Sequence, residues 1–172
     1  MLRVLSVRDY VIAERVELEP GAAFSVLSGE TGAGKSILVD ALELLVGGRA
    51  EAALVREGAE RAELSAEFEV GAGSALAAWI AAAGLEGDAG SLILRRSIDA
   101  AGRSRCFING HAATLAQLRE AGEFLVDIHG QHAHQSLLRP ASQLQLLDEH
   151  GGLTPARRAV AETFGLAYAP LN

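Results

Sequence analysis

A glycine-rich segment of eight residues restricts the fold of this 172-residue chain more than any other feature of its sequence. Residues 29–36 read Gly-Glu-Thr-Gly-Ala-Gly-Lys-Ser and fit the pattern G-x-x-x-x-G-K-[ST]. The apolar run before them, residues 24–27, predicts a buried strand, and the spacing of leucines in residues 36–46 predicts a helix. Strand, glycine-rich turn and helix in this order are typical of an α/β protein with a phosphate-binding P-loop.

The residue types of this P-loop suit a phosphate chain. Glycines let successive backbone N–H groups point inward, and the following helix adds the positive end of its dipole. Lys35 is the only lysine among fifteen basic residues, and its compact ammonium suits the β- and γ-phosphates better than a planar guanidinium does. The Ser36 hydroxyl can bind Mg²⁺. We therefore predict nucleotide contacts from Gly29, Glu30, Thr31, Gly32, Ala33, Gly34, Lys35 and Ser36.

Composition narrows the class of protein. With 49% hydrophobic and 22% charged residues, the chain can build one ordinary globular core. A single cysteine, Cys106, excludes a disulfide framework, and we expect it to be a small buried residue. No apolar run is long enough for a membrane span, and the first residues are too charged for a secretory signal, so we expect a cytoplasmic location. The net charge of −7 means that nucleic acid would need a local basic patch.

The remaining pattern predicts a mixed sheet with helices. Period-two or β-branched runs predict strands over residues 2–7, 15–19, 63–70, 92–98 and 103–108, the last two forming a hairpin. A second buried strand is expected over residues 124–128, parallel to the strand before the P-loop. Helices are expected over residues 74–83, 114–120 and 140–149, and another begins at Thr154-Pro155 and carries Val160, Phe164 and Tyr168.

Two side-chain clusters admit more than one interpretation. Arg95, Arg96, Arg103 and Arg105 form the densest basic stretch, which could contact DNA phosphates or could be solvated and salt-bridged. Because neighbouring strand residues face opposite sides, Arg95 and Arg96 must split this patch. His129, His132 and His134 could bind a metal, but their spacing favours loop histidines.

A complete hydrolytic site is not expected in this chain. Hydrolysis needs a second acidic Mg²⁺ ligand and a group that positions water. Asp127 is the only aspartate that ends an apolar strand-like run, and Ile128 rather than an acidic residue follows it.

Several segments together resemble one family. They are residues 7–12, the P-loop with residues 37–42, Gly47-Gly-Arg-Ala50, Leu54-Val-Arg56, Phe107-Ile-Asn-Gly110 and residues 128–135, Ile-His-Gly-Gln-His-Ala-His-Gln. The chain resembles, to about Asp148, the amino-terminal head segment of the RecN family, SMC-like ATPases of bacterial DNA double-strand-break repair.

This resemblance implies the amino-terminal lobe of an ABC-type ATPase head. In that fold the two ends of the chain build one head and a long coiled coil joins them. Gln131 matches the Q-loop glutamine that reaches Mg²⁺ and the attacking water, which gives it a catalytic role beside Lys35. Residues 1–150 would form the head lobe, and residues 151–172 a helix leading toward the coiled coil.

The same resemblance implies the partners. Hydrolysis would need the protein's own carboxy-terminal head segment and head–head dimerisation, so this chain alone would bind ATP with little turnover. The full-length protein would act on DNA at the nucleoid and would not contact a membrane.

Two other classes of function stay open at the level of the sequence. The first is a small self-sufficient P-loop phosphotransferase, for which Arg103 and Arg105 are the only lid candidates. The second is an interaction module with a degenerate P-loop.

Overall fold

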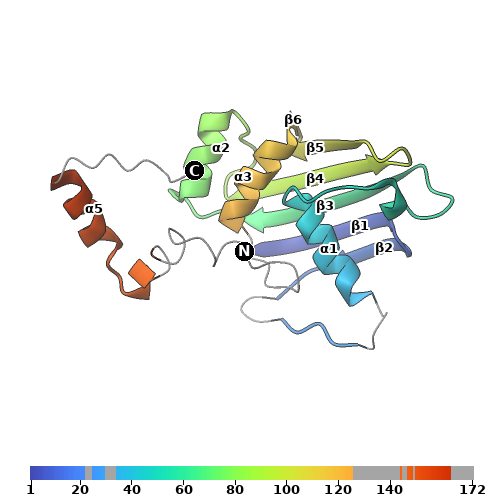
Figure 1. Cartoon of the computed structure of the whole chain (residues 1–172), viewed down its shortest axis with the longest axis horizontal. Coiled ribbons are helices and arrows are strands. Elements are labelled where there is room, and N and C mark those ends of the chain that lie inside the picture. The colour runs from blue at the N-terminus through green and yellow to red at the C-terminus, as the bar shows by residue number, and fades with distance from the viewer. Residues whose placement is uncertain (22–24, 30–33, 126–143, 145–146, 149, 164–172) are drawn as a thin grey trace. The chain divides into compact units, whose positions relative to one another are not determined.

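The computed structural model describes residues 1–21, 25–29, 34–125, 144, 147–148, 150–163 in two separate units. The first unit is Met1–Val126 and the second is Asp127–Asn172. We describe each unit by itself (Figure 1).

A six-stranded sheet forms the centre of the first unit. Its strand order is β2-β1-β3-β4-β5-β6, and all neighbouring strands are antiparallel. The strands are β1 (Leu2–Tyr10), β2 (Ala13–Leu18), β3 (Arg61–Glu69), β4 (Ser91–Asp99), β5 (Ser104–Ile108) and β6 (His111–Ala113). Side chains alternate between the two faces of each strand, so one face of the sheet is buried. In β3, every second residue from Ala62 to Phe68 is at most 1% exposed.

Three helices accompany this sheet. They are α1 (Lys35–Leu45), α2 (Ala75–Ala83) and α3 (Leu115–Leu125), and a short 3₁₀ helix, η1, covers Ala52–Leu54. Helix α1 packs on β1, β3 and β4, while α3 packs on β5 and on α2; α1 and α3 cross the same face of the sheet (Figure 1). The core therefore lies between this face and the helices, and the other face of the sheet carries mainly polar side chains.

The predicted strands and helices of the first unit are largely confirmed. The predicted hairpin is β4–β5, and Asn109-Gly110 forms the two-residue turn into β6 with positive φ at both positions. Helix α2 begins after Ser74, whose hydroxyl accepts a hydrogen bond from the Ala77 N–H at 3.2 Å. The predicted α/β fold class is confirmed.

One predicted strand is wrong, and a second is wrong at its first two residues. Residues 25–29 form no strand, and Val26 and Leu27 are 74% and 50% exposed. A buried strand needs a hydrogen-bonded neighbour, and no described strand pairs with this segment. Phe124 and Leu125, where the second strand was predicted to start, are the last residues of α3, because the buried positions Leu118 and Ala121 continue the helical period. The rest of that predicted strand, residues 126–128, lies outside the described residues. The described part of the sheet is thus purely antiparallel, and the expected parallel strands are not in it.

The second unit contains a helix where one was predicted. Helix α5 covers Thr154–Thr163, which confirms its start at Thr154-Pro155. Residues 144, 147, 148 and 150 are helical, within or next to the predicted helix 140–149, and Asp148 pairs with Arg157 at 3.0 Å. Phe164 and Tyr168 lie outside the described residues. No helix in the described part of the chain is long and apolar enough to cross a membrane.

Candidate nucleotide-binding site

The structure describes Gly29, Gly34, Lys35 and Ser36 of the predicted P-loop, whereas residues 30–33 lie outside the described residues. Gly34 has φ +86° and ψ 2°, a left-handed conformation that a residue with a Cβ rarely adopts. Helix α1 begins at the next residue, Lys35, whose Nζ donates a hydrogen bond to the Gly29 carbonyl oxygen. The lysine side chain therefore folds back to the first residue of the loop.

The amino-terminal end of α1 is suited to an anion. No side chain caps it, and its first turn contains no acidic residue. No carboxylate of this first turn therefore competes for its N–H groups and the positive end of its dipole. Ser36 is exposed there, and the ammonium of Lys35 lies at the Gly29 carbonyl. These residues fit a phosphate group, with the Ser36 hydroxyl available as an oxygen ligand for Mg²⁺.

The carboxy-terminal end of α1 is bound by two arginines. Arg96 of β4 is 1% exposed, and its Nη1 donates to the carbonyl oxygens of Leu44 and Gly48, at 2.6 Å each. Its Nη2 donates to the Ser104 hydroxyl at 3.2 Å. Arg119 of α3 donates from Nε to the Gly47 carbonyl oxygen at 2.9 Å. Burial lowers the pKa of the Arg96 guanidinium from its ordinary value.

Arg96 therefore does not belong to a DNA-contacting patch, which corrects one of the two interpretations of the hairpin arginines. The alternation of Leu92, Leu94, Arg96 and Ile98 puts it on the core face of β4. That alternation is visible in the sequence. It shows that a charge enters the core but not which carbonyl groups it meets.

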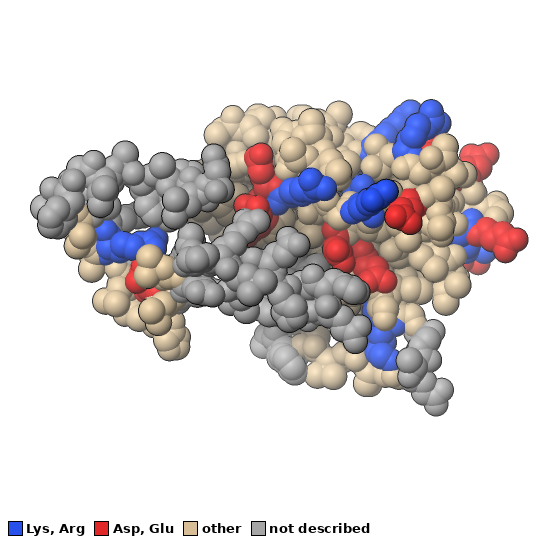
Figure 2. Space-filling model, in the orientation of Figure 1, with Lys and Arg blue, Asp and Glu red and all other residues tan. Residues whose placement is uncertain are grey.

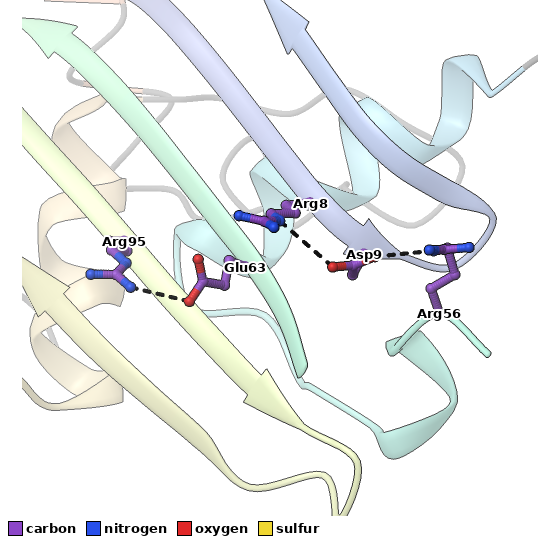
Figure 3. Close-up of polar contacts among 5 residues, drawn as sticks. All are labelled: Arg8, Asp9, Arg56, Glu63 and Arg95. Atoms are coloured by element: carbon purple, nitrogen blue, oxygen red, sulfur yellow. Dashed lines mark hydrogen bonds and ion pairs between the residues drawn. The ribbon is translucent and has the colours of Figure 1, made fainter. Parts of the chain in front are cut away.

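The other hairpin arginines lie outside the core and are mostly paired. Arg95 bridges to Glu63 of β3 at 3.2 Å (Figure 3). Its guanidinium carbon also lies over the Phe107 ring, 5.6 Å from the ring centroid. Arg103 pairs with Asp99 at 2.9 Å, and hydrogen bonds from the Arg103 backbone, then from its side chain and Ala101, lower the pKa of Asp99. Arg105 is exposed.

Acidic side chains accompany arginines elsewhere in the first unit as well. Asp9 of β1 lies between Arg56, at 3.1 Å, and Arg8, at 3.7 Å (Figure 3). On the face shown in Figure 2, Lys and Arg side chains of this unit lie beside Asp and Glu rather than forming one basic surface. The described residues thus favour the salt-bridged interpretation of these arginines.

Several predicted functional residues cannot be placed. Gln131, Asp127 and the three histidines 129, 132 and 134 lie outside the described residues. Among the residues the structure does describe, no group of three or more His, Cys, Asp or Glu side chains could hold a metal ion. Cys106 is buried, as predicted, and burial raises the pKa of its thiol.

The chain is similar in fold to solved ATPase heads. An SMC ATPase structure aligns with a TM-score of 0.61 at 19% identity, over 86% of this chain and 97% of that one. RecF with ATP aligns with a TM-score of 0.57 at 18% identity, over 87% of this chain and 38% of the RecF chain. The SMC head domain from Thermotoga maritima gives 0.53 at 17% identity, over 69% and 41%. The fold is therefore that of the SMC and RecF class of ABC-type P-loop ATPase heads.

Sequence relatives identify the group within this class. The chain is 48% identical over 162 residues to the DNA repair protein RecN of Xylella fastidiosa, covering 94% of this chain and 29% of the relative. It is 42% identical over 165 residues to RecN of Vibrio cholerae, and 42% identical over 152 residues to RecN of Bacillus subtilis. No protein-family model matches the chain.

The chain matches the amino-terminal part of these RecN proteins, as the sequence motifs predicted. The alignment with the Vibrio cholerae protein includes 95% of this chain but only 29% of that protein. The alignment with the Bacillus subtilis protein includes 88% of this chain and 26% of that protein. The chain thus spans less than a third of the length of the curated relatives that it matches.

Proposed function

We propose that the P-loop, residues 29–36, binds Mg-ATP, and that the whole protein is a RecN-type ATPase of DNA double-strand-break repair. The observation that carries the proposal is the return of Lys35 to the Gly29 carbonyl at the start of α1, directly after the left-handed Gly34. The relatives are named DNA repair proteins, and one structural neighbour is RecF with ATP. Both findings support this assignment.

Each P-loop residue has a proposed part in holding the nucleotide. The backbone N–H groups from Gly29 to Ser36 would bind phosphate oxygens, as they do at other helix amino-termini. When the nucleotide binds, the Lys35 ammonium would leave the Gly29 carbonyl oxygen and donate to the β- and γ-phosphates instead, because charged acceptors make stronger hydrogen bonds. Ser36 and Gln131 would be the Mg²⁺ ligands, and Gln131 would also orient the attacking water. Bound Mg²⁺ would neutralise charge on the phosphates.

The proposal extends to parts of the protein beyond this chain. Residues 1–150 would be one lobe of the head, and residues 151–172 would lead toward the coiled coil. None of the described strands ends in an acidic pair, so hydrolysis would need the carboxy-terminal head segment and a second head. The SMC neighbour is described as undergoing ATP-driven dimerisation and DNA-stimulated activation, which is compatible with a head–head homodimer acting on DNA at the nucleoid.

Calorimetric titration with Mg-ATP, run beside a turnover assay on the 172-residue chain, tests the proposal. We expect binding without significant turnover, and we expect Lys35→Ala to weaken binding by about tenfold or more, since it removes a charged hydrogen bond worth roughly 1.5–3 kcal/mol. Arg49→Ala is a matched control, because the Arg49 side chain is 89% exposed and pairs only with Glu51 at 3.8 Å among the described residues.

Three other outcomes would contradict parts of the proposal. Turnover that depends on Lys35 would show that the chain already holds a complete hydrolytic site. Phosphate transfer to nucleosides or small metabolites would favour the phosphotransferase, although Arg103, one of its two lid candidates, is paired with Asp99. Absence of Mg-ATP binding by the unmodified chain would favour an interaction module.

A further inference from the structure

The helix that follows the P-loop is buried most deeply toward its carboxy-terminal end. Helix α1 has eleven residues, a length of about 16 Å at roughly 1.5 Å per residue. Its buried side chains, Ala41, Leu44 and Leu45, all lie in its last five residues. Nearer the P-loop, Ser36, Val39 and Asp40 are exposed, and Ile37 and Leu38 are only partly buried against the core. The groups that hold the last turns therefore contribute to where the loop end lies.

Arg96 is the most deeply buried of the polar groups at those last turns. Its guanidinium, 1% exposed, donates to Leu44 O and Gly48 O at 2.6 Å each, so one nitrogen joins the last turn of α1 to the segment that leaves it. The hydrogen bond to Ser104 fixes the other terminal nitrogen to β5. No carboxylate among the described residues pairs with Arg96. The charge is instead opposed by the negative end of the α1 dipole.

Arg119 completes this attachment from a third element. Its Nε donates to the Gly47 carbonyl, and a Cβ at Gly47 would lie 2.2 Å from Arg119 Cγ. Only a glycine at position 47, with φ +95°, leaves room for this close approach. Carbonyl oxygens at the end of a helix need partners from outside the helix. Arg96 supplies one such bond, to Leu44 O, and guanidinium groups from β4 and α3 bind two further carbonyl groups, of Gly48 and Gly47, in the segment that leaves α1.

We infer that Arg96 is a positioning residue of the nucleotide-binding site, acting through α1 rather than by contact with the nucleotide. The inference rests on the proposed function. A tilt of about 5° at the attached end would displace the loop end by about 1.4 Å over a helix of this length. Displacements of about 1 Å are enough to disrupt hydrogen bonds to a bound phosphate chain. Arg96 therefore sets nucleotide affinity from the opposite end of the helix.

The test compares Mg-ATP affinities of folded variants of the 172-residue chain. Arg96→Met removes the donors, Arg96→Lys keeps the charge and one donor group, and Arg95→Met changes the neighbouring arginine on the opposite face of β4. Titrations are run well below the unfolding temperature of each variant, so that loss of stability does not enter the dissociation constant. We expect Arg96→Met to raise the Kd for Mg-ATP about tenfold or more. Arg96→Lys should recover part of the lost affinity, and the Kd of Arg95→Met should stay within about twofold of that of the unmodified chain.

The outcomes separate this inference from the proposed function. Unchanged Kd in folded Arg96→Met would overturn the inference while leaving the proposed function intact. No binding by the unmodified chain would overturn both. If Arg96→Met does not fold, Arg119→Met decides, because Arg119 is exposed and its removal leaves the core intact. We expect this variant to raise Kd severalfold, and an unchanged value would overturn the inference.

Discussion

Gly122 offers a sharp test of how closely α3 and α1 pack. It is a buried residue in the last turn of α3, where a Cβ would lie 2.6 Å from the Cβ of Val46 and 3.2 Å from the Val46 carbonyl oxygen. Contacts this short require the end of α1 to move away from α3. The perturbation is the substitution Gly122→Ala, which adds one methyl group to this contact.

Two effects of opposite sign set the magnitude. Alanine is favoured over glycine inside a helix by about 1 kcal/mol. Overpacking of a close-packed contact costs about 1–3 kcal/mol, and here the contacting atoms are a β-branched side chain and backbone, which cannot rotate away. We expect the cost to exceed the gain, for a net loss of about 1–2 kcal/mol in the free energy of unfolding. In a chain of this length that corresponds to a fall in Tm of roughly 3–8 °C.

Urea unfolding followed by circular dichroism measures this difference. Gly71→Ala is the matched control, because a Cβ at Gly71 meets no atom within 4 Å and its φ is not in the left-handed region. We expect the control to be neutral or to stabilise the protein by about 0.4–1 kcal/mol. If Gly122→Ala is as stable as the unmodified chain or more so, the close approach of the two helices is refuted.

Three further predictions concern other elements of the first unit. Burial, together with the charges of Asp40 and Glu43, raises the pKa of Tyr10 from 10.0 to about 12, so the folded state keeps the proton that the unfolded state loses. Urea unfolding at pH 9 and 11.5 should therefore show a loss of stability that is about 2 kcal/mol larger in the unmodified chain than in Tyr10→Phe; an equal loss in both chains would contradict it. Ser74→Ala should lower the stability of the chain by about 1 kcal/mol in thermal unfolding, since it removes the cap of α2, whereas no change would refute the cap. Asn109→Gly keeps the positive φ of the turn but loses the side-chain bonds to Leu85 O and Ile93 N, at 2.8 and 2.9 Å, and should cost about 1–3 kcal/mol by urea unfolding.

Segments whose structure depends on near neighbours were predictable from the sequence. The leucine spacing after the P-loop predicted α1, and the alternation of residues 63–70 predicted β3. Asn109-Gly110 predicted a tight turn, since both residues tolerate positive φ. The P-loop itself was predictable as a motif, because its chemistry requires particular residues at fixed spacing.

Segments whose structure depends on distant partners were not predictable. Residues 25–27 have the composition of a buried strand, yet a strand forms only where another strand offers hydrogen bonds, and none of the described strands does. The apolar side chains of Phe124 and Leu125 are compatible with a strand or a helix. The packing of the preceding turns of α3 makes them helical. Short apolar runs carry too little periodicity to separate these cases.

Arg96 has one feature that the local sequence determines and another that depends on distant partners. The sequence alone determined that it faces the opposite side of its strand from Arg95, because side chains alternate with a period of two. Only the tertiary structure decided that its partners are the carbonyl groups of Leu44 and Gly48. Those residues lie some fifty positions away in the chain, and a local pattern holds no information about carbonyl groups that folding brings from that distance.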